Sequence, residues 1–104
     1  MGAPEAYVEK YLVAEIAAIG GRAMKFTSPG TSGVPDRVVM APGAHTLFVE
    51  LKRPGGRPRP LQVVTIEAMR ESGADVRVID TREGVDDLVR ELRREGGAAN
   101  GDGD

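Results

Sequence analysis

The chain has 104 residues, 40% of them apolar, which is enough for one domain with a modest core. No apolar stretch has the length of a signal peptide or membrane span, so we expect an intracellular protein with no membrane partner. Cysteine is absent, which excludes disulfides and thiolate zinc sites. With a single histidine, His45, any metal site depends on carboxylate and carbonyl oxygens, which favours Mg²⁺ or Mn²⁺.

The net charge of −2 is unevenly distributed along the chain. Residues 1–70 hold nine basic and six acidic side chains, whereas residues 71–104 hold five basic and ten acidic ones. Four cations and no acid lie among the glycines and prolines of residues 52–59: Lys52, Arg53, Arg57 and Arg59. Such a loop can bind phosphates. The alternative is a solvated turn whose charges merely keep it in water.

The predicted elements run in the order helix, three strands, helix, strand, helix. Apolar residues recur at helical spacing from Pro4 to Ile19, and Gly20-Gly21 ends this first helix. A short strand is expected over Ala23–Phe26. A loop of Thr, Ser, Gly and Pro follows, from Thr27 to Val34.

The remaining elements begin with a β-hairpin of two strands, Asp36–Met40 and Thr46–Leu51. Helical spacing returns in residues 61–71, a further strand is expected at 76–79, and an amphipathic helix is expected at about 82–94. Residues 95–104 are rich in Gly, Ala and Asp, so we expect a disordered tail. The sequence therefore predicts a single α/β domain over residues 1–94.

Two acids and a lysine are the side chains of the hairpin that carry chemistry. Asp36 opens one strand and Glu50 ends its antiparallel neighbour, so both lie near the same end of the sheet. Lys52 faces the same way as Glu50, because side chains two apart on a strand share a face. Leu51 then faces the core and leaves its carbonyl available to a metal. Metal-assisted phosphodiester cleavage requires this set of groups.

Each of these residues also has a structural interpretation. Asp36 is a common residue for capping a turn after proline, and Glu50 with Lys52 is a common solvent-facing pair on a strand. His45 is expected to be a solvated turn residue without a catalytic role. A structural role explains each residue separately, but it does not explain why they converge beside a basic loop.

Three segments in this order closely resemble the VRR-NUC branch of the PD-(D/E)XK nuclease superfamily. They are Gly33-Val34-Pro35-Asp36-Arg37, Phe48-Val49-Glu50-Leu51-Lys52-Arg53-Pro54-Gly55-Gly56, and Leu61-Gln62. The likeness runs from about Val8 to Leu88. It implies a restriction-endonuclease-like core, in which a mixed sheet is flanked by helices. It also implies an endodeoxyribonuclease that uses Mg²⁺ or Mn²⁺ and selects branched DNA such as four-way (Holliday) junctions, often as a homodimer, in the cytoplasm of a bacterium or phage-infected cell.

The resemblance also implies roles for individual residues. Asp36 and Glu50 match the metal ligands, Lys52 the catalytic lysine, and Gln62 the supporting polar residue of the following helix. The family places another acid, a further metal ligand, in the first helix, where Glu9 fits better than Glu5 or Glu15. The expected phosphate contacts are Lys25, Ser28, Arg37, Arg53, Arg57 and Arg59.

The alternatives to these roles are again structural. Gln62 is then an exposed residue at a helix start, and Glu9 is half of a surface ion pair. The alternative function is a module of the same fold that binds DNA junctions without cutting them. The motif here lacks none of its acids and retains its lysine, which favours the nuclease.

Overall fold

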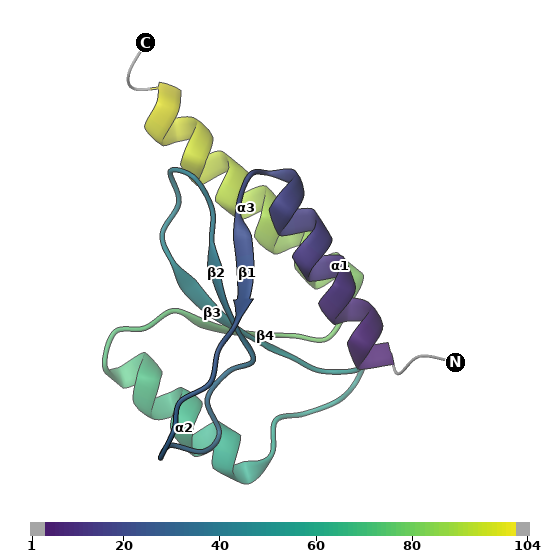
Figure 1. Ribbon diagram of the computed structural model, residues 1–104, viewed down its shortest axis with the longest axis vertical. Coiled ribbons are helices and arrows are strands. Elements are labelled where there is room, and N and C mark those ends of the chain that lie inside the picture. Colours follow the sequence, from purple (N-terminus) through teal and green to yellow (C-terminus); the bar gives the residue numbers. More distant parts are fainter. Residues whose placement is uncertain (1–3, 102–104) are drawn as a thin grey trace.

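A four-stranded mixed sheet with three helices makes up the computed structural model, which describes residues 4–101 (Figure 1). The helices are α1 (Pro4–Ala18), α2 (Pro60–Glu71) and α3 (Arg82–Gly101), and the strands are β1 (Arg22–Lys25), β2 (Arg37–Met40), β3 (Leu47–Leu51) and β4 (Val76–Ile79). This order is the predicted one, and most boundaries agree within a residue. None of the described helices is long and apolar enough to cross a membrane.

The strands lie in the order β1-β2-β3-β4. The β1–β2 and β2–β3 pairs are antiparallel, whereas β3 and β4 are parallel and joined through α2. Parallel strands require such a crossover connection. The carboxyl ends of β3 and β4 therefore lie at the same end of the sheet, next to the start of β2.

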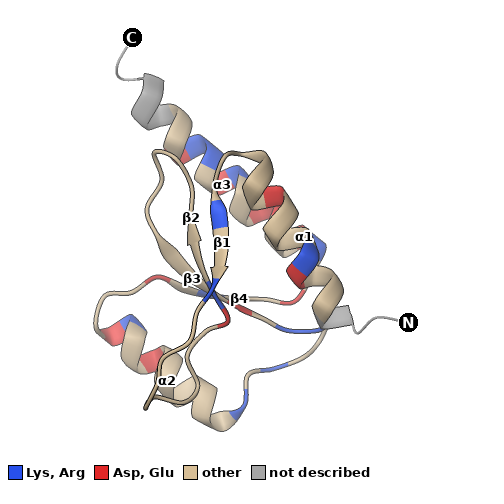
Figure 2. Cartoon of the chain, viewed as in Figure 1, with Lys and Arg blue, Asp and Glu red and all other residues tan. Residues whose placement is uncertain are grey.

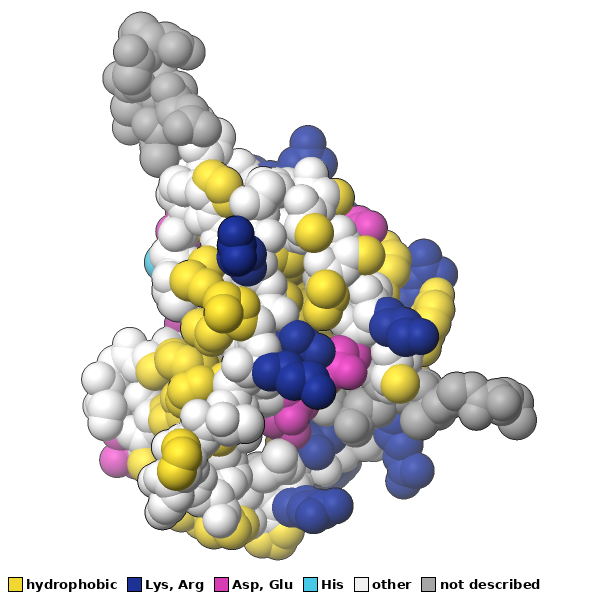
Figure 3. Space-filling view, viewed as in Figure 1, with side chains coloured by type: hydrophobic (Ala, Val, Ile, Leu, Met, Phe, Trp, Pro, Cys, Tyr) yellow, Lys and Arg dark blue, Asp and Glu magenta, His cyan; other side chains and the backbone are white. Residues whose placement is uncertain are grey.

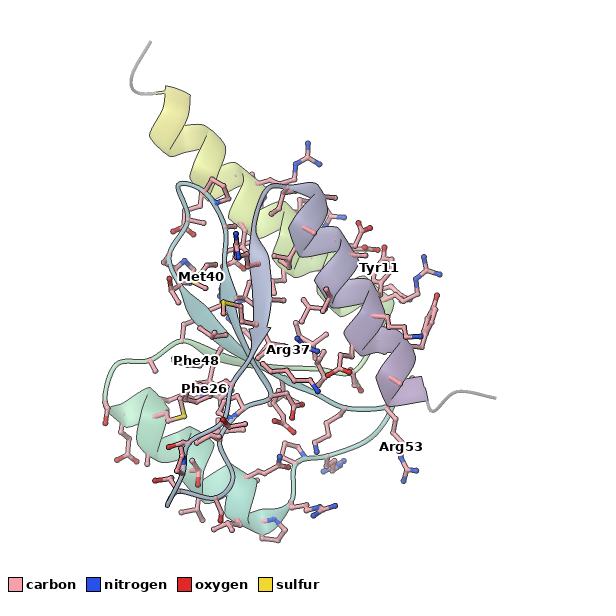
Figure 4. The ribbon with its side chains drawn as sticks, in the orientation of Figure 1. Tyr11, Phe26, Arg37, Met40, Phe48 and Arg53 are labelled. Atoms are coloured by element: carbon pink, nitrogen blue, oxygen red, sulfur yellow. The ribbon has the colours of Figure 1, made fainter. Side chains whose placement is uncertain are left out.

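The two faces of β3 differ in chemistry. Leu47, Val49 and Leu51 are buried in the core that α1 and α3 form with the sheet. Side chains alternate along a strand, so Phe48 and Glu50 point to the opposite face, where α2 lies. Phe48 packs there against Phe26, with ring centroids 5.2 Å apart (Figure 4). The predicted orientation of Leu51 toward the core is confirmed.

Helix α3 extends beyond its predicted end. The expectation of a disordered tail from residue 95 is wrong for residues 95–101, which are helical; residues 102–104 lie outside the described part of the chain. The reason is tertiary. The Glu95 carboxylate accepts the backbone N–H of His45 at 2.7 Å. Gly96 lies so close to the hairpin turn that a Cβ there would be 2.5 Å from the Pro42 carbonyl oxygen.

Candidate active site

Glu50 is the buried acid at the centre of the site. It is 1% exposed, at the end of β3 beneath α2. Its Oε2 accepts hydrogen bonds from Gln62 Nε2 at 2.8 Å and from Lys52 Nζ at 3.0 Å. Its Oε1 is buried without a hydrogen-bond partner among the described residues. Burial raises the pKa of Glu50, and the Asp36 carboxylate adds to this, while the hydrogen bond from Lys52 opposes it.

Asp36 lies where the hairpin ladder stops. The last paired residues of β2 and β3 are Arg37 and Val49. The same register, continued, places Pro35 opposite Leu51, and proline has no N–H to donate. The Asp36 side chain takes over there, because its Oδ2 accepts the Leu51 N–H at 3.0 Å. Pro35 has no N–H that could donate to the Leu51 carbonyl. The ladder thus ends with a fixed carboxylate and with a carbonyl that Pro35 cannot engage.

Gln62 connects the start of α2 to Glu50. Its Oε1 accepts the Arg59 N–H at 3.0 Å, which satisfies a free backbone donor at the helix start. With the oxygen used in this way, the amide nitrogen points at Glu50. One side chain therefore caps the helix and holds the acid, which is more than an exposed helix-start residue does.

The loop before Asp36 packs closely against α2. Thr65 Oγ1 donates to the Ser32 carbonyl at 2.8 Å. Gly33 has φ +84°, and a Cβ there would lie 2.9 Å from the Leu61 carbonyl oxygen, so only glycine fits. Thr65 was not predicted from the sequence, although it lies one helical turn after Gln62. Together these contacts fix the loop that leads into Asp36.

A cavity of about 460 Å³ opens where these elements meet. The residues that line it are Ser32, Gly33, Val34, Asp36, Glu50, Lys52, Arg59, Leu61 and Gln62. Four of the five predicted catalytic residues are therefore brought together. The basic residue Arg59 joins them at the rim.

Glu9, the fifth predicted catalytic residue, does not line this cavity. Its Oε2 pairs with Arg37 Nη2 at 3.2 Å. No group of three or more His, Asp or Glu side chains in the described part of the chain could hold a metal ion together. Glu9 therefore contacts Arg37, the residue that follows Asp36 in the chain. Its carboxylate does not form one metal-binding group with those of Asp36 and Glu50.

Arg37 has little surface left for a phosphate. Its side chain is 12% exposed and points from β2 toward α1, and Nη1 also donates to the Ala23 carbonyl at 2.9 Å (Figure 4). The other predicted phosphate contacts remain accessible. Lys25 is exposed on β1, and Ser28 is half-buried in the loop after it; neither lines the cavity.

The loop between β3 and α2 is the basic region of the site. Arg53, Arg57 and Arg59 are exposed, and none has an ion-pair partner among the side chains of residues 6–97, which the structure describes. Basic side chains gather over this segment, at the lower right of the molecule (Figures 2 and 3). An unneutralised positive surface beside a carboxylate cavity suits a polyanionic backbone.

A mixed sheet that brings two acids and a lysine to one end, beneath a helix that supplies a glutamine, is the arrangement of PD-(D/E)XK enzymes. Fold and site together define the chain as an endonuclease of this class. A comparison with models of protein families finds no match.

Two individual proteins specify the class further. A protein of Acyrthosiphon pisum secondary endosymbiont phage 1, named "Putative nuclease p44", is 45% identical over 76 residues, which are 73% of this chain and 82% of the relative. A solved structure described as "VRR_NUC domain" superposes with a TM-score of 0.78 at 34% identity, over 86% of this chain and 97% of that one. The chain belongs to the VRR-NUC family of nucleases.

Proposed function

We propose that the protein hydrolyses DNA phosphodiester bonds with the help of Mg²⁺ or Mn²⁺ bound at the end of the sheet. The observation that carries the proposal is the Glu50 Oε1 atom, buried without a hydrogen-bond partner among the described residues. A buried anionic oxygen without a partner is costly, and a cation would compensate it. The donors fit a hard cation, since they are oxygens: Glu50, the nearby Asp36 and the Leu51 carbonyl.

A bound cation would supply charge neutralisation at the scissile phosphate and a more acidic attacking water. The protein's own side chains would hold the metal ligand in place, orient the attacking water and bind the DNA. Gln62 and Lys52 hold Glu50 through Oε2, which leaves Oε1 without a partner in the described part of the chain and available to the proposed cation. Lys52 lines the cavity, where its ammonium can orient the attacking water or neutralise phosphate charge. Arg53, Arg57 and Arg59 would bind the DNA backbone near the N-terminal end of α2.

The cleavage chemistry is tested with DNA substrates in the presence and absence of Mg²⁺ or Mn²⁺. We expect cleavage only with a divalent ion, and loss of cleavage in Asp36→Asn. Calorimetric titration of the cation provides a second readout that does not depend on activity. Full Mg²⁺-dependent cleavage by Asp36→Asn would contradict the proposal.

The substrate we propose is branched DNA, with four-way junctions as the leading case, cut by a homodimer. A chain of this size has limited surface with which to grip a duplex, and two sites related by a two-fold axis suit a symmetric junction. A panel of junctions, flaps, nicked and linear duplexes tests the selectivity, and light scattering tests the dimer. Equal rates on all substrates, or a monomer mass at working concentration, would contradict this part.

The setting we propose is the cytoplasm of a bacterial cell, where such DNA is present. Support comes from the phage origin of the relative with 45% identity. Fractionation of cells that produce the protein tests this placement. Recovery of the protein in the membrane fraction would contradict it.

A further inference from the structure

We infer that Asp80 is a positioning residue, which holds the basic loop of residues 52–59 against the active-site end of the sheet. The inference rests on the proposed DNA-cleaving function. Its starting observation is a hydrogen bond between the residue after β4 and the basic loop: Asp80 Oδ2 accepts the backbone N–H of Gly55 at 3.0 Å. A carboxylate that accepts a backbone N–H makes a charge-assisted bond, stronger than a neutral one.

The geometry of the loop explains why this contact is available. Residues 53–56 form a β-turn, closed by the Gly56 N–H and the Arg53 carbonyl at 2.7 Å. Pro54 occupies the second position and Gly55, with φ +78°, the third, which is the pattern of a type II turn. The N–H of the third residue takes no part in the bond that closes the turn. The Gly55 N–H is therefore free to donate outside the turn, and Asp80 is the acceptor it contacts.

Asp80 is well placed to act as an anchor because the backbone is fixed on both sides of it. On one side, the Ile79 carbonyl accepts the Lys52 N–H at 3.0 Å, which extends the pairing of β3 with β4. On the other, Thr81 Oγ1 accepts the Gly84 N–H at 2.9 Å and caps α3. Asp80 thus lies at the carboxyl end of β4, beside the strand end from which Lys52 begins the basic loop.

The anchor bears on DNA binding through entropy. Arg53, Arg57 and Arg59 are exposed, and a loop that presents them in one conformation loses less freedom when it binds a phosphate backbone than an unanchored loop does. Asp80 also carries a negative charge close to these cations, and a charge alone would weaken DNA binding. The two effects have opposite signs, so they can be separated by experiment.

The separating variants are Asp80→Asn, which keeps an oxygen acceptor without the charge, and Asp80→Ala, which removes both. If Asp80 is an anchor, Asp80→Ala raises KM on the order of tenfold, the loss of one charge-assisted hydrogen bond, with kcat unchanged. Asp80→Asn then keeps KM at or below the wild-type value. Asp87→Ala is the matched control, because Asp87 is an exposed acid of α3 whose carboxylate contacts Arg90. An equal fall in KM in both Asp80 variants, or no change in Asp80→Ala, would overturn the inference.

Hydrogen exchange at the Gly55 amide of the free protein gives a readout independent of catalysis. We expect faster exchange in Asp80→Ala and near wild-type exchange in Asp80→Asn. A folded Asp80→Ala variant, verified by thermal unfolding, whose Gly55 amide stays protected would refute the anchor. Absence of cleavage by the wild type would refute the proposed function instead, and the variants would then be compared by their affinity for DNA.

Discussion

The two ends of the β3–β4 pair use the same kinds of side chain for different purposes. At the carboxyl ends, Glu50 and Lys52 face the cavity, and one oxygen of Glu50 has no protein partner among the described residues. At the amino ends, His45 lies between two acids, with Nε2 2.7 Å from Asp75 and Nδ1 2.8 Å from Glu95. The nitrogen–oxygen distances are similar at both ends, so they do not by themselves distinguish an active site from a structural cluster of charges.

The difference is in how completely the charges are satisfied. Asp75 also binds Arg77 at 2.6 Å, and Arg77 binds Glu91 at 2.8 Å, so acids and bases alternate through the amino-end cluster. Hydrogen bonds from Arg77 and His45 lower the pKa of Asp75, while those to Asp75 and Glu95 raise the pKa of His45. At Glu50 the pKa moves the other way for an acid, upward, because burial outweighs its partners. The charges of the amino-end cluster are therefore paired, whereas Glu50 keeps one oxygen available to the proposed cation.

Glu50→Gln tests the difference between the two ends most directly. We expect cleavage to fall by roughly a thousandfold, because the variant would remove an anionic ligand of the proposed cation. The free energy of unfolding should stay within about 1 kcal/mol or rise, since a buried and incompletely paired charge is removed. Kinetics and denaturant unfolding measure the two effects. A large loss of stability with cleavage retained would show that Glu50 belongs with the structural charges.

Lys52→Ala should have the next largest effect, a loss of roughly a hundredfold in kcat, within the range for a group that acts on proton transfer or phosphate charge. Lys52→Arg is the matched variant, as it keeps the charge in a larger, planar group. Partial recovery in Lys52→Arg would assign the role to charge, and no recovery would assign it to the compact ammonium. Unchanged kcat in Lys52→Ala would place Lys52 outside the chemistry.

What could be predicted from sequence at these two ends depends on how local the interactions are. Glu50, Leu51 and Lys52 follow from the alternation of a strand, and Asp36 follows from the hairpin that returns to it. His45 is exposed in the hairpin turn, as predicted, but its contacts with acids were not predicted, because Glu95 lies fifty residues away on a helical segment expected to be disordered. The amino-end cluster exists only through tertiary contacts, which no local pattern records.

The same argument applies to the residues around the cavity. Gln62 was identified through resemblance, yet its double contact with Arg59 and Glu50 could be seen only once α2 was placed over β3. Glu9 was placed in the site by family pattern, and the structure pairs it with Arg37 instead. Its catalytic role stays a prediction.

Gln62 offers a test of intermediate size, because its two functions can be separated. Gln62→Glu keeps the oxygen that accepts the Arg59 N–H but places a second carboxylate against Glu50. Gln62→Ala removes both contacts. We expect roughly tenfold slower cleavage in both, the scale of one lost hydrogen bond. Both should unfold at lower temperature: Gln62→Ala because it loses helix capping, and Gln62→Glu because its carboxylate repels Glu50, an effect that should diminish at acidic pH. Unchanged thermal stability in Gln62→Ala would contradict the capping role.

The smallest effect we expect is at the other end of the sheet, in His45→Gln. The folded pKa of His45 is raised above its ordinary 6.5, so the stability it contributes is present below pH 6.5 and is lost as pH rises through the folded pKa. Asp75 and Glu95 are lowered from 3.8 and 4.5, so their contribution is present above those values and is lost as pH falls through their folded pKa values. The cluster is therefore most stabilising between about pH 4.5 and 6.5.

Thermal unfolding of wild type and His45→Gln across this range measures the contribution. We expect the variant to unfold a few degrees lower, about 3 °C, near the middle of the window, and the difference to shrink above it, since partly exposed pairs contribute little. Cleavage of DNA should be unchanged, because the cluster lies at the far end of β3 from Glu50. A pH-independent difference would assign the contribution of His45 to packing, and a loss of kcat would show that the two ends of the sheet are coupled.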